Sequence, residues 1–226
     1  MNIEVLSQSP LFQGISQGEL AHIMNQVHYQ MRSYEAEDLI AHSNDPCDFL
    51  YVVLEGSVRG DMIDFSGKTI KIEDMTAPSP VASAFLFGQH RKLPVNIVAN
   101  QKVTILMIPR ASVIQMFQIS PVFLENFLNM ISTRAQFLSM KIKFLSFKTI
   151  REKIAQYLLN LAGKDKEMVT IPHSQQSLAD LFGVTRPSLA RTMGELDREG
   201  IIELQRREIR ILDRKGLNLM LRGNQE

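Results

Sequence analysis

The sequence predicts an α+β fold in three consecutive parts: short β-strands, one long helix, and a helix-turn-helix followed by a hairpin. Three observations predict it. Apolar and polar residues alternate in short runs through much of residues 33–109. Apolar residues recur at heptad spacing from residue 124 to residue 145. Two helical patterns then meet at Gly183, which is the arrangement of a helix-turn-helix.

The front segment has the punctuation of a β-domain. The stretch SYEAEDLIAHSNDPCDFLYVVLEGSVRGDMI is broken by Asp-Pro and Glu-Gly, and FLYVVLEGSV is a β-branched and aromatic run interrupted by Gly56. KTIKIEDM, VNIVA and VTILMIP continue the pattern. A helical stretch of about Gln17–Gln26 precedes them. Strands this short at this spacing predict a sandwich or barrel.

The middle segment, PVFLENFLNMISTRAQFLSMKIKFLSF, contains no glycine and no proline after Pro121. One apolar seam has spacings of four and three, as in a coiled coil: Leu124, Leu128, Ile131, Ala135, Leu138, Ile142 and Leu145. A second stripe lies beside it: Phe123, Phe127, Met130, Phe137 and Phe144. A helix of a monomer needs only one apolar face. We therefore expect one face to pack on the front domain and the seam to pack on a second copy. A fully buried central helix is the alternative, and the regular seam disfavours it.

The back segment begins with Thr149-Ile-Arg-Glu152, the pattern of a capping box, and this helix should stop at Gly163. A short helix, about Gln175–Phe182, then meets a turn at Gly183. A second helix starts after Thr185 and ends near Gly200. IIELQRREIRIL follows as a hairpin whose tip is basic, so the pattern predicts a helix-turn-helix with a wing.

Arginines stand where helix electrostatics disfavour them. Arg186 opens the second helix and Arg191 follows five residues later, although the helix dipole disfavours cations near the N-terminus. In a helix-turn-helix this end enters the major groove, where arginine reads guanine bidentately. That contact, about 1–3 kcal/mol, outweighs a dipole term of about 0.3–1 kcal/mol. The alternative is simple surface pairing of the arginines with Asp180 or Glu195. The predicted DNA-binding residues are Thr185, Arg186, Pro187, Ser188 and Arg191 on the helix, and Arg206 and Arg207 on the wing.

Charge and cysteine content agree with this division. Residues 1–110 hold 8 Lys and Arg against 12 Asp and Glu, whereas residues 147–226 hold 14 against 11, so a polyanion would contact the back segment. The single cysteine, Cys47, excludes an intrachain disulfide and favours a reducing compartment, the cytoplasm. The N-terminus lacks the pattern of a signal peptide, and no apolar run is long enough to span a bilayer, so no membrane partner is expected.

From FLYVVLEGSV to LADLFGVTRPSLARTMGELDREGII, the chain resembles the Crp/Fnr superfamily of bacterial transcription regulators. The resemblance implies a β-roll sensor of the cyclic-nucleotide-binding type (a double-stranded β-helix) in residues 1–117. It implies a dimerisation helix in residues 118–147 and a winged helix-turn-helix in residues 148–226. It also implies a homodimer that binds a two-fold symmetric operator and responds to a small effector, with RNA polymerase as a further candidate partner.

Two departures from the family pattern concern the ligand and the operator. Nucleotide-binding members carry Gly-Glu and, ten residues later, Arg-Ser or Arg-Thr, where this chain has Ala82-Ser83 and Leu93-Pro94. The glutamate for the ribose and the arginine for the phosphate are both missing, so we expect that cyclic AMP is not the effector. Arg91 or Lys92 is the alternative phosphate ligand. Pro187 replaces a frequent glutamate, so the operator should differ there.

The amino-acid composition bears on which other effectors the front segment could bind. One cysteine cannot hold an iron–sulfur cluster. An apolar pocket suits haem, a fatty acid or another flat hydrophobe, and its predicted lining is Phe85, Phe87, Phe123, Phe127 and Met130. The alternative is that most of these phenylalanines are simply core residues. The chain also resembles the subgroup that regulates the hybrid cluster protein and nitrosative-stress genes, which implies haem and nitric oxide. The candidate haem ligands are His22, His28, His42, His90 and several methionines of the front segment. His90 is the least poor of them, because it lies between Ala82-Ser83 and Leu93-Pro94, in the segment that forms the phosphate cassette of nucleotide-binding members.

We therefore predict an effector-controlled, dimeric DNA-binding regulator. A constitutive DNA-binding protein whose β-roll is only a dimer scaffold is the second hypothesis. An enzyme is not expected, since no nucleophile elbow, zinc-protease or P-loop pattern occurs.

Overall fold

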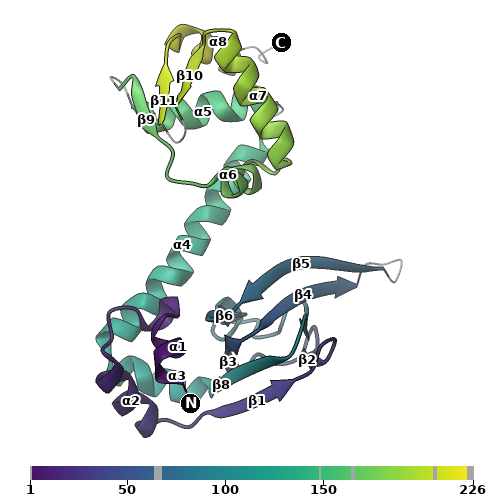
Figure 1. The fold of residues 1–226 in the computed structure, drawn as a ribbon, viewed down its shortest axis with the longest axis vertical. Helices are drawn as coiled ribbons and strands as arrows, with labels where there is room; N and C mark the ends of the chain where they lie inside the picture. Colours follow the sequence, from purple (N-terminus) through teal and green to yellow (C-terminus); the bar gives the residue numbers. More distant parts are fainter. Residues whose placement is uncertain (1, 64–67, 148, 164–165, 206–207, 223–226) are drawn as a thin grey trace. The chain divides into compact units, whose positions relative to one another are not determined.

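The structure, a computed structural model, describes residues 2–63, 68–147, 149–163, 166–205 and 208–222. The chain divides into two compact units, Met1–Thr133 and Arg134–Glu226 (Figure 1). The first combines helices with two β-sheets and the second combines helices with one, so the predicted α+β class is confirmed.

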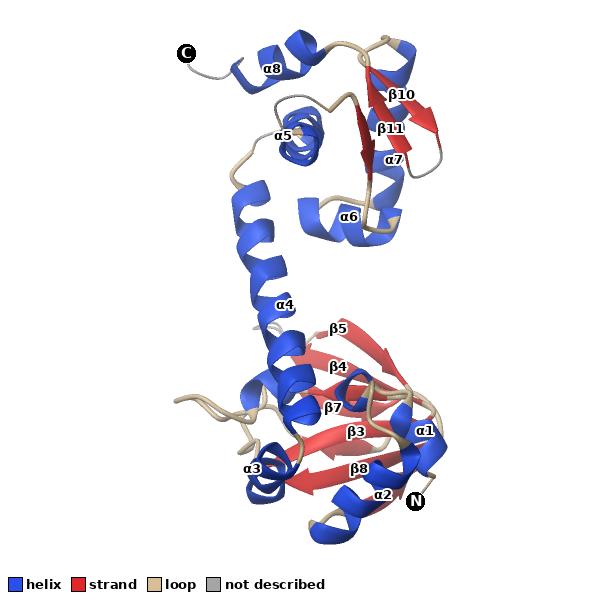
Figure 2. Ribbon diagram, turned by 90° about the vertical axis from the view of Figure 1, so that its left-hand side faces the viewer, coloured by secondary structure: helices blue, strands red, loops and turns tan. Residues whose placement is uncertain are grey.

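Two four-stranded antiparallel sheets form the β-roll of the N-terminal unit (Figure 2). The first has the order β1-β8-β3-β6 and the second β2-β7-β4-β5. Their bounds are β1 (Gln30–Tyr34), β2 (Leu39–Ala41), β3 (Phe49–Glu55), β4 (Ser57–Ile63), β5 (Thr69–Thr76), β6 (Ser79–Val81), β7 (Asn96–Ala99) and β8 (Val103–Pro109). The runs FLYVVLE, KTIKIEDM, VNIVA and VTILMIP are therefore strands, as predicted, and Gly56 separates β3 from β4.

Short helices gather with the start of the long helix at one side of this roll (Figure 1). They are α1 (Ile3–Ser7), η1 (Pro10–Phe12), α2 (Gln17–Gln26) and α3 (Arg110–Ile119), and the long helix is α4 (Pro121–Leu145). A further 3-10 turn, η2 (Ser83–Phe85), lies between β6 and β7. α2 has the predicted bounds, whereas α1 and α3 had not been expected.

The first sheet is buried on both faces, because successive side chains along its strands point to opposite sides and both sides are apolar. In β3, Leu50 and Val52 point toward the helices, while Tyr51 and Val53 point into the interior of the roll. β8 divides its side chains in the same way. This two-sided burial explains why both strands read as nearly continuous apolar runs. The N-terminal unit therefore has two apolar cores: a helix-side core and a roll-interior core.

The two predicted faces of α4 behave differently. In the second stripe, Phe123 and Phe127 are buried in the helix-side core, but Phe137 and Phe144 pack in the core of the C-terminal unit. The stripe was expected to pack on the front domain alone. It instead divides between both units, because its residues lie on both sides of the boundary near residue 133.

The predicted seam is largely open to solvent. Leu128, Leu138 and Ile142 are exposed, Ile142 by 71%. Ala135 and Leu145 are exposed as well, whereas Leu124 and Ile131 are half-buried. The alternative of a fully buried central helix is therefore wrong for this chain.

The C-terminal unit packs helices around a three-stranded sheet of order β10-β11-β9. Its elements are α5 (Ile150–Ala162), β9 (Met168–Thr170), α6 (Gln175–Phe182), α7 (Arg186–Arg198), β10 (Ile202–Gln205), β11 (Glu208–Ile211) and α8 (Arg214–Arg222). The predicted capping box opens α5. The Oγ1 atom of Thr149 accepts from the Glu152 amide at 3.1 Å, and a Glu152 carboxylate oxygen accepts from the Thr149 amide at 3.4 Å. α6 and α7 are the predicted helix pair, and α8 had not been expected.

Gly183 makes the turn between α6 and α7. Its φ of 66° lies in the left-handed region, and the amides of Gly183 and Val184 bond back to the carbonyls of Asp180 (3.2 Å) and Ala179 (3.0 Å). A Cβ on Gly183 would stand 2.7 Å from the Cδ2 atom of Leu145. Leu145, a predicted seam residue, is thus also a neighbour of this turn.

Gly183→Ala should lower the free energy of unfolding of the C-terminal unit by about 1–2 kcal/mol, because left-handed backbone strains an L-residue. Gly194→Ala is the matched control. Gly194 lies within α7, where an added methyl group would meet no neighbouring described side chain within 4 Å, and the substitution should gain about 0.5–1 kcal/mol of helix stability. Thermal unfolding of both variants measures the difference. Equal melting temperatures would show that the turn does not need glycine.

Candidate nucleic-acid interface

The first turn of α7 is capped as the sequence predicted. Thr185 is the N-cap, and its Oγ1 atom accepts from the Ser188 amide at 3.3 Å. The hydroxyls of Thr185 and Ser188 are 2.8 Å apart, so one of the two can still donate to an outside acceptor. Pro187 stands in the first turn, where a missing N–H leaves no bond unmade. These residues therefore hold the start of α7 in a fixed conformation.

Arg186 and Arg191 are both exposed, and neither makes an ion pair within the described part of the chain. The alternative partners are not used: the Asp180 carboxylate accepts instead from Gln176 at 3.0 Å. Simple surface pairing of these arginines is therefore wrong. Both guanidinium groups are available to an external anion or base edge.

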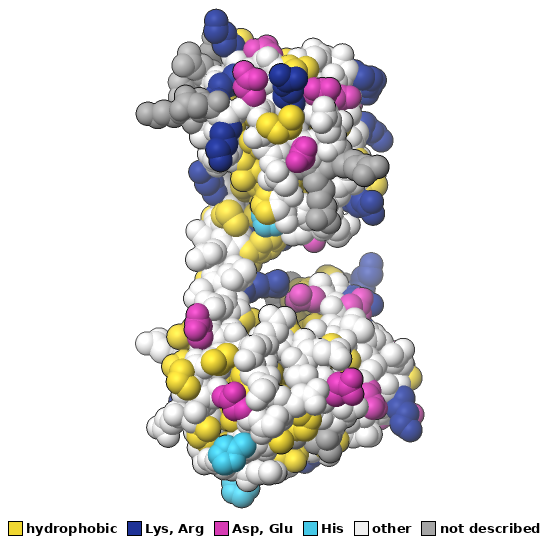
Figure 3. Space-filling model, turned by 60° about the vertical axis from the view of Figure 1, so that its left-hand side comes forward, with side chains coloured by type: hydrophobic (Ala, Val, Ile, Leu, Met, Phe, Trp, Pro, Cys, Tyr) yellow, Lys and Arg dark blue, Asp and Glu magenta, His cyan; other side chains and the backbone are white. Residues whose placement is uncertain are grey.

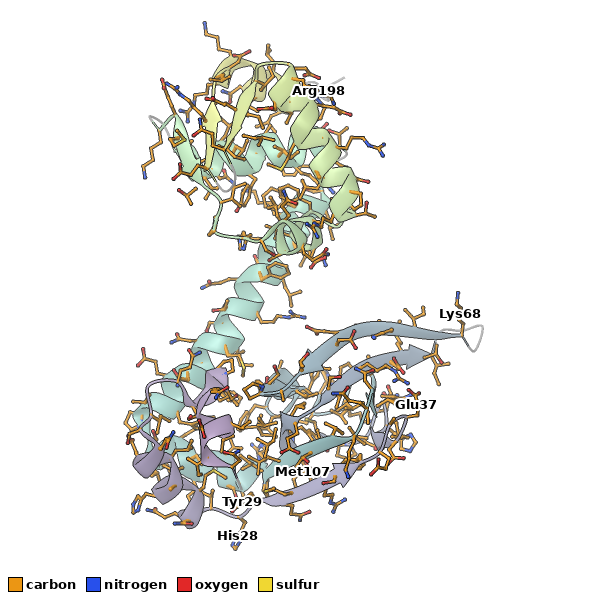
Figure 4. All side chains as sticks on the ribbon, viewed as in Figure 1. His28, Tyr29, Glu37, Lys68, Met107 and Arg198 are labelled. Atoms are coloured by element: carbon orange, nitrogen blue, oxygen red, sulfur yellow. The ribbon has the colours of Figure 1, made fainter. Side chains whose placement is uncertain are left out.

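The two arginines leave α7 in different directions. Five residues at 3.6 residues per turn separate them by about 140° around the helix axis. Leu189 and Leu196 are buried on the core face of α7, and Arg191 lies on the face opposite. Arg198, seven residues after Arg191, shares that outer face and stands in the last turn (Figure 4). Arg198 is not among the sequence-predicted residues, and its Nε atom donates to the carbonyl oxygen of Gly194 at 3.1 Å.

Arg186 instead borders a hollow beside the N-terminus of α6. The hollow has a volume of about 430 Å³, and its lining includes Gln175 and Gln176 at the start of α6 and His173 just before that helix. Ser174 caps α6 by accepting from the Ser177 amide at 3.1 Å. A helix N-terminus attracts anions, so this hollow suits a phosphate of a nucleic-acid backbone. These α6 residues had not been predicted as part of the site, although Ser174 before an apolar run is an N-cap signal.

The wing exists as predicted. β10 and β11 pair antiparallel, with Gln205 opposite Glu208 at the end of the ladder. Arg206 and Arg207, the predicted wing contacts, lie outside the described residues. On β11, Arg210 is exposed and lies 3.9 Å from Glu167. Figure 3 shows Lys and Arg side chains interspersed with Asp and Glu on the visible face of the C-terminal unit, so the unit is not a uniform cationic surface.

In the N-terminal unit, the cassette positions hold apolar or small side chains. Leu93 is 1% exposed and belongs to the roll-interior core, with its backbone bonded to Asn44 and Asp45. The Ser83 hydroxyl is 3.9 Å from the sulfur of Met130. Arg91, the alternative phosphate ligand, is exposed and pairs with Asp48 at 3.3 Å.

Cys47 is buried beside this cassette, with its sulfur 3.9 Å from the carbonyl oxygen of Ala82. Burial, and secondarily the nearby Asp48 carboxylate, raises the pKa of the Cys47 thiol to about 11. The thiol is therefore protonated at neutral pH and is a poor metal ligand. Within the described residues, no group of three or more His, Cys, Asp or Glu side chains could hold a metal ion.

The five predicted effector-pocket residues lie in two different cores. Phe87, Phe123, Phe127 and Met130 belong to or pack on the helix-side core, whereas Phe85 packs on the roll-interior core. The rings of Phe87 and Phe127 contact each other edge to face at 5.8 Å. The structure therefore does not bring all five together around one space. The four on the helix side pack as core residues.

His90 is exposed in the described structure, and the rings on the helix side are packed against one another. Haem needs an axial ligand directed at a flat apolar slot. The residues around His90 do not fit that requirement. Among the described helices, none is long and apolar enough to cross a membrane.

Comparison with known proteins places each unit in a family. Residues 31–120 match the cyclic nucleotide-binding domain, and residues 152–220 match the Crp-like helix-turn-helix domain. The chain is 23% identical over 181 residues to the cAMP-activated global transcriptional regulator CRP of Salmonella typhimurium, covering 77% of this chain and 86% of that protein. It is 23% identical over 197 residues to the cyclic AMP receptor protein of Thermus thermophilus, covering 87% and 89%.

The fold is also similar to a solved structure. The catabolite activator protein of Thermus thermophilus matches with a TM-score of 0.55 and 21% identity, covering 95% of this chain and 99% of that one. The two matched domains lie one in each unit of this chain. The protein is thus a DNA-binding transcription regulator of the Crp/Fnr type, with an effector-binding domain.

Proposed function

We propose that the protein works as a homodimer which reads a two-fold symmetric operator and responds to a small effector other than cyclic AMP. The observation that carries the DNA part is the pair of exposed arginines on α7, which have no ion-pair partner within the described residues. An arginine without a partner at the positive end of a helix is stabilised when an external acceptor binds it.

On this proposal, α7 enters the major groove. Arg191 reads base edges from the outer face, while Arg186 contacts a base or the phosphate beside the start of α6. Thr185, Pro187 and Ser188 fix the approach of the helix. Arg206 and Arg207 contact phosphates from the wing, which adds affinity without sequence information.

The dimer follows from the open seam of α4. Leu128, Leu138 and Ile142 are exposed at coiled-coil spacing, together with Ala135 and half-buried Leu124 and Ile131. An apolar stripe of this length is stabilised by burial against an equivalent stripe. A second copy would bring two copies of α7 to two half-sites about one helical turn apart. Leu145 is the last residue of the predicted seam, and it lies beside Gly183 in the turn of the helix-turn-helix.

Leu138→Asp should abolish the dimer or raise its dissociation constant by more than about 100-fold, because a charge would be buried without a partner. Leu219→Asp is the control. Leu219 is 65% exposed on α8, outside the seam, and its substitution should leave assembly unchanged. Sedimentation of both variants measures the effect. A Leu138→Asp protein that remains dimeric would exclude the seam as the interface.

Arg186→Ala and Arg191→Ala should each weaken binding to the specific operator by about 1–3 kcal/mol and flatten the preference for one base in each half-site. The double variant Arg206→Ala, Arg207→Ala should weaken all sequences about equally and lower the salt slope by roughly one unit per lost phosphate contact.

The measurement is a binding titration on an operator library at several salt concentrations. The wing variant serves as the internal comparison for loss of charge alone. A uniform loss of affinity in Arg186→Ala, with base preference intact, would make Arg186 a phosphate contact. The same result for Arg191→Ala would contradict base reading by α7.

The relatives are named for cyclic AMP, but the cassette of this chain supports another effector. A nucleotide phosphate needs a cation, and Leu93 offers a buried apolar side chain in its place. Arg91 is paired with Asp48 on the surface. An apolar effector beside Phe85 and Leu93 fits these residue types better. Whether transcription then rises or falls, through RNA polymerase or by blocking it, depends on where the operator lies.

Millimolar cyclic AMP should give no binding isotherm by calorimetry and should leave operator affinity unchanged. The Arg91→Ala variant tests the opposite result: if cyclic AMP does bind, this variant shows whether Arg91 holds its phosphate. A clear isotherm that disappears in Arg91→Ala would identify Arg91 as a shifted phosphate ligand and would overturn the apolar assignment.

An absorption spectrum of protein from haem-replete cells tests the resemblance to the nitric-oxide subgroup. A Soret band would show that haem binds and would contradict the misfit around His90.

One observation favours a second candidate, constitutive DNA binding. The rings of Phe117 and Phe127 are 5.1 Å apart and join Phe87 and Phe123 in one packed cluster, so the helix side of the roll has the character of a scaffold. Operator affinity that stays constant across a panel of fatty acids, nucleotides and haem would favour this candidate over effector control.

A further inference from the structure

The turn of the helix-turn-helix is contacted by a buried cation from another helix. Lys153, in the first turn of α5, is only 7% exposed. Its Nζ atom donates to the carbonyl oxygen of Phe182, the last residue of α6, at 2.7 Å. A buried ammonium is costly unless it is hydrogen-bonded, so this contact fixes where the side chain can lie.

The accepting carbonyl is one that the turn itself does not satisfy. Among the last carbonyls of α6, those of Ala179 and Asp180 accept from the amides of Val184 and Gly183. The carbonyl of Phe182 lies beyond these bonds, at the negative end of the helix dipole. Lys153 therefore supplies both a donor and a positive charge to the carboxyl end of α6.

The same turn of α5 also contacts the far end of α7. Arg151 binds both carboxylate oxygens of Glu199, the residue that follows α7, and the contact between its NH1 atom and the Oε1 atom measures 2.8 Å. Arg151 holds the pKa of the Glu199 carboxyl below its ordinary value. Lys153 and Arg151 thus contact the chain just before and just after α7. The Lys153 contact is buried, whereas the Arg151 pair is open to water and is weakened by it.

We propose that Lys153 is a positioning residue for operator reading. Its ammonium fixes the carboxyl end of α6, and through the three-residue turn it fixes the start of α7 where Arg186 lies. Base contacts depend on this placement, whereas attraction to phosphates depends mainly on charge. Loss of the ammonium contact should therefore reduce sequence discrimination more than general DNA affinity. This inference rests on the proposed DNA-binding function.

The test uses the full chain and two substitutions. Lys153→Met keeps the length of the side chain without a donor, and Lys153→Arg keeps a cationic donor. Wild-type protein first selects an operator from randomised double-stranded DNA. Affinities for that operator and for a random duplex are then measured well below the unfolding temperature. Lys153→Met should weaken operator binding about tenfold or more and random binding by less than about threefold. Lys153→Arg should recover most of the loss.

Leu217→Ala is the control for stability. Leu217 is fully buried in α8, which lies at the other end of this unit from α6 (Figure 1). It should lower the melting temperature as Lys153→Met does, yet keep the ratio of operator to random affinity. If Leu217→Ala loses the same ratio, Lys153 contributes only stability and the inference is wrong.

Amide hydrogen exchange gives a readout that does not need DNA. The amides of Gly183 and Val184 should exchange faster in Lys153→Met than in wild type, and should be unchanged in Leu217→Ala. Failure of the wild type to select any sequence would contradict the proposed function, and exchange would still decide whether Lys153 holds the turn. If the wild type selects an operator and Lys153→Met binds that operator as tightly as the wild type does, the inference is wrong. The proposed function would not be affected by this result.

Discussion

The left-handed backbone at Gly183 is the constraint on which the DNA-binding unit depends. It ends α6, returns two amides to the carbonyls of that helix, and starts α7 three residues later. The surrounding contacts converge on it. The ring of Phe144, in the last turns of α4, lies 4.8 Å from that of Phe182, and Lys153 binds the Phe182 carbonyl. The position of Arg186 at the start of α7 is therefore set by contacts from α4, α5 and α6 as well as by α7 itself.

The N-terminal unit rests on a different constraint, the burial of β3 and β8 on both faces. One face supports the helices and the start of α4, and the other closes the interior of the roll. Leu93 completes that interior, where the resemblance to nucleotide-binding members would place an arginine. On the proposed function, this replacement of a charged group by an apolar one would change the effector chemistry while the two sheets stay closed around an apolar interior.

α4 contributes side chains to the cores of both units. Its Phe123 and Phe127 belong to the first core, and its Phe144 belongs to the second, while the seam residues Leu128, Leu138 and Ile142 stay exposed. The proposed dimer would cover them. Burial against any apolar surface stabilises an apolar helix face. One face with a regular apolar pattern can therefore pack on different surfaces at different points along the helix. This explains why the second stripe was misassigned to a single domain: periodicity defines a face but not the surface that covers it.

The sequence by itself determined the class of elements, because period-2 and heptad patterns, capping residues and glycine turns are local signals. It predicted the bounds of α2, the capping box at Thr149 and the cap at Thr185. It did not predict α3 or α8, nor the separation of Phe85 from Phe123. Only the tertiary structure decided that Arg186 and Arg191 lack ion-pair partners within the described residues, that Arg186 borders the start of α6, and that Lys153 reaches Phe182. These features depend on how separate elements pack against one another, and local patterns in the sequence do not specify that packing.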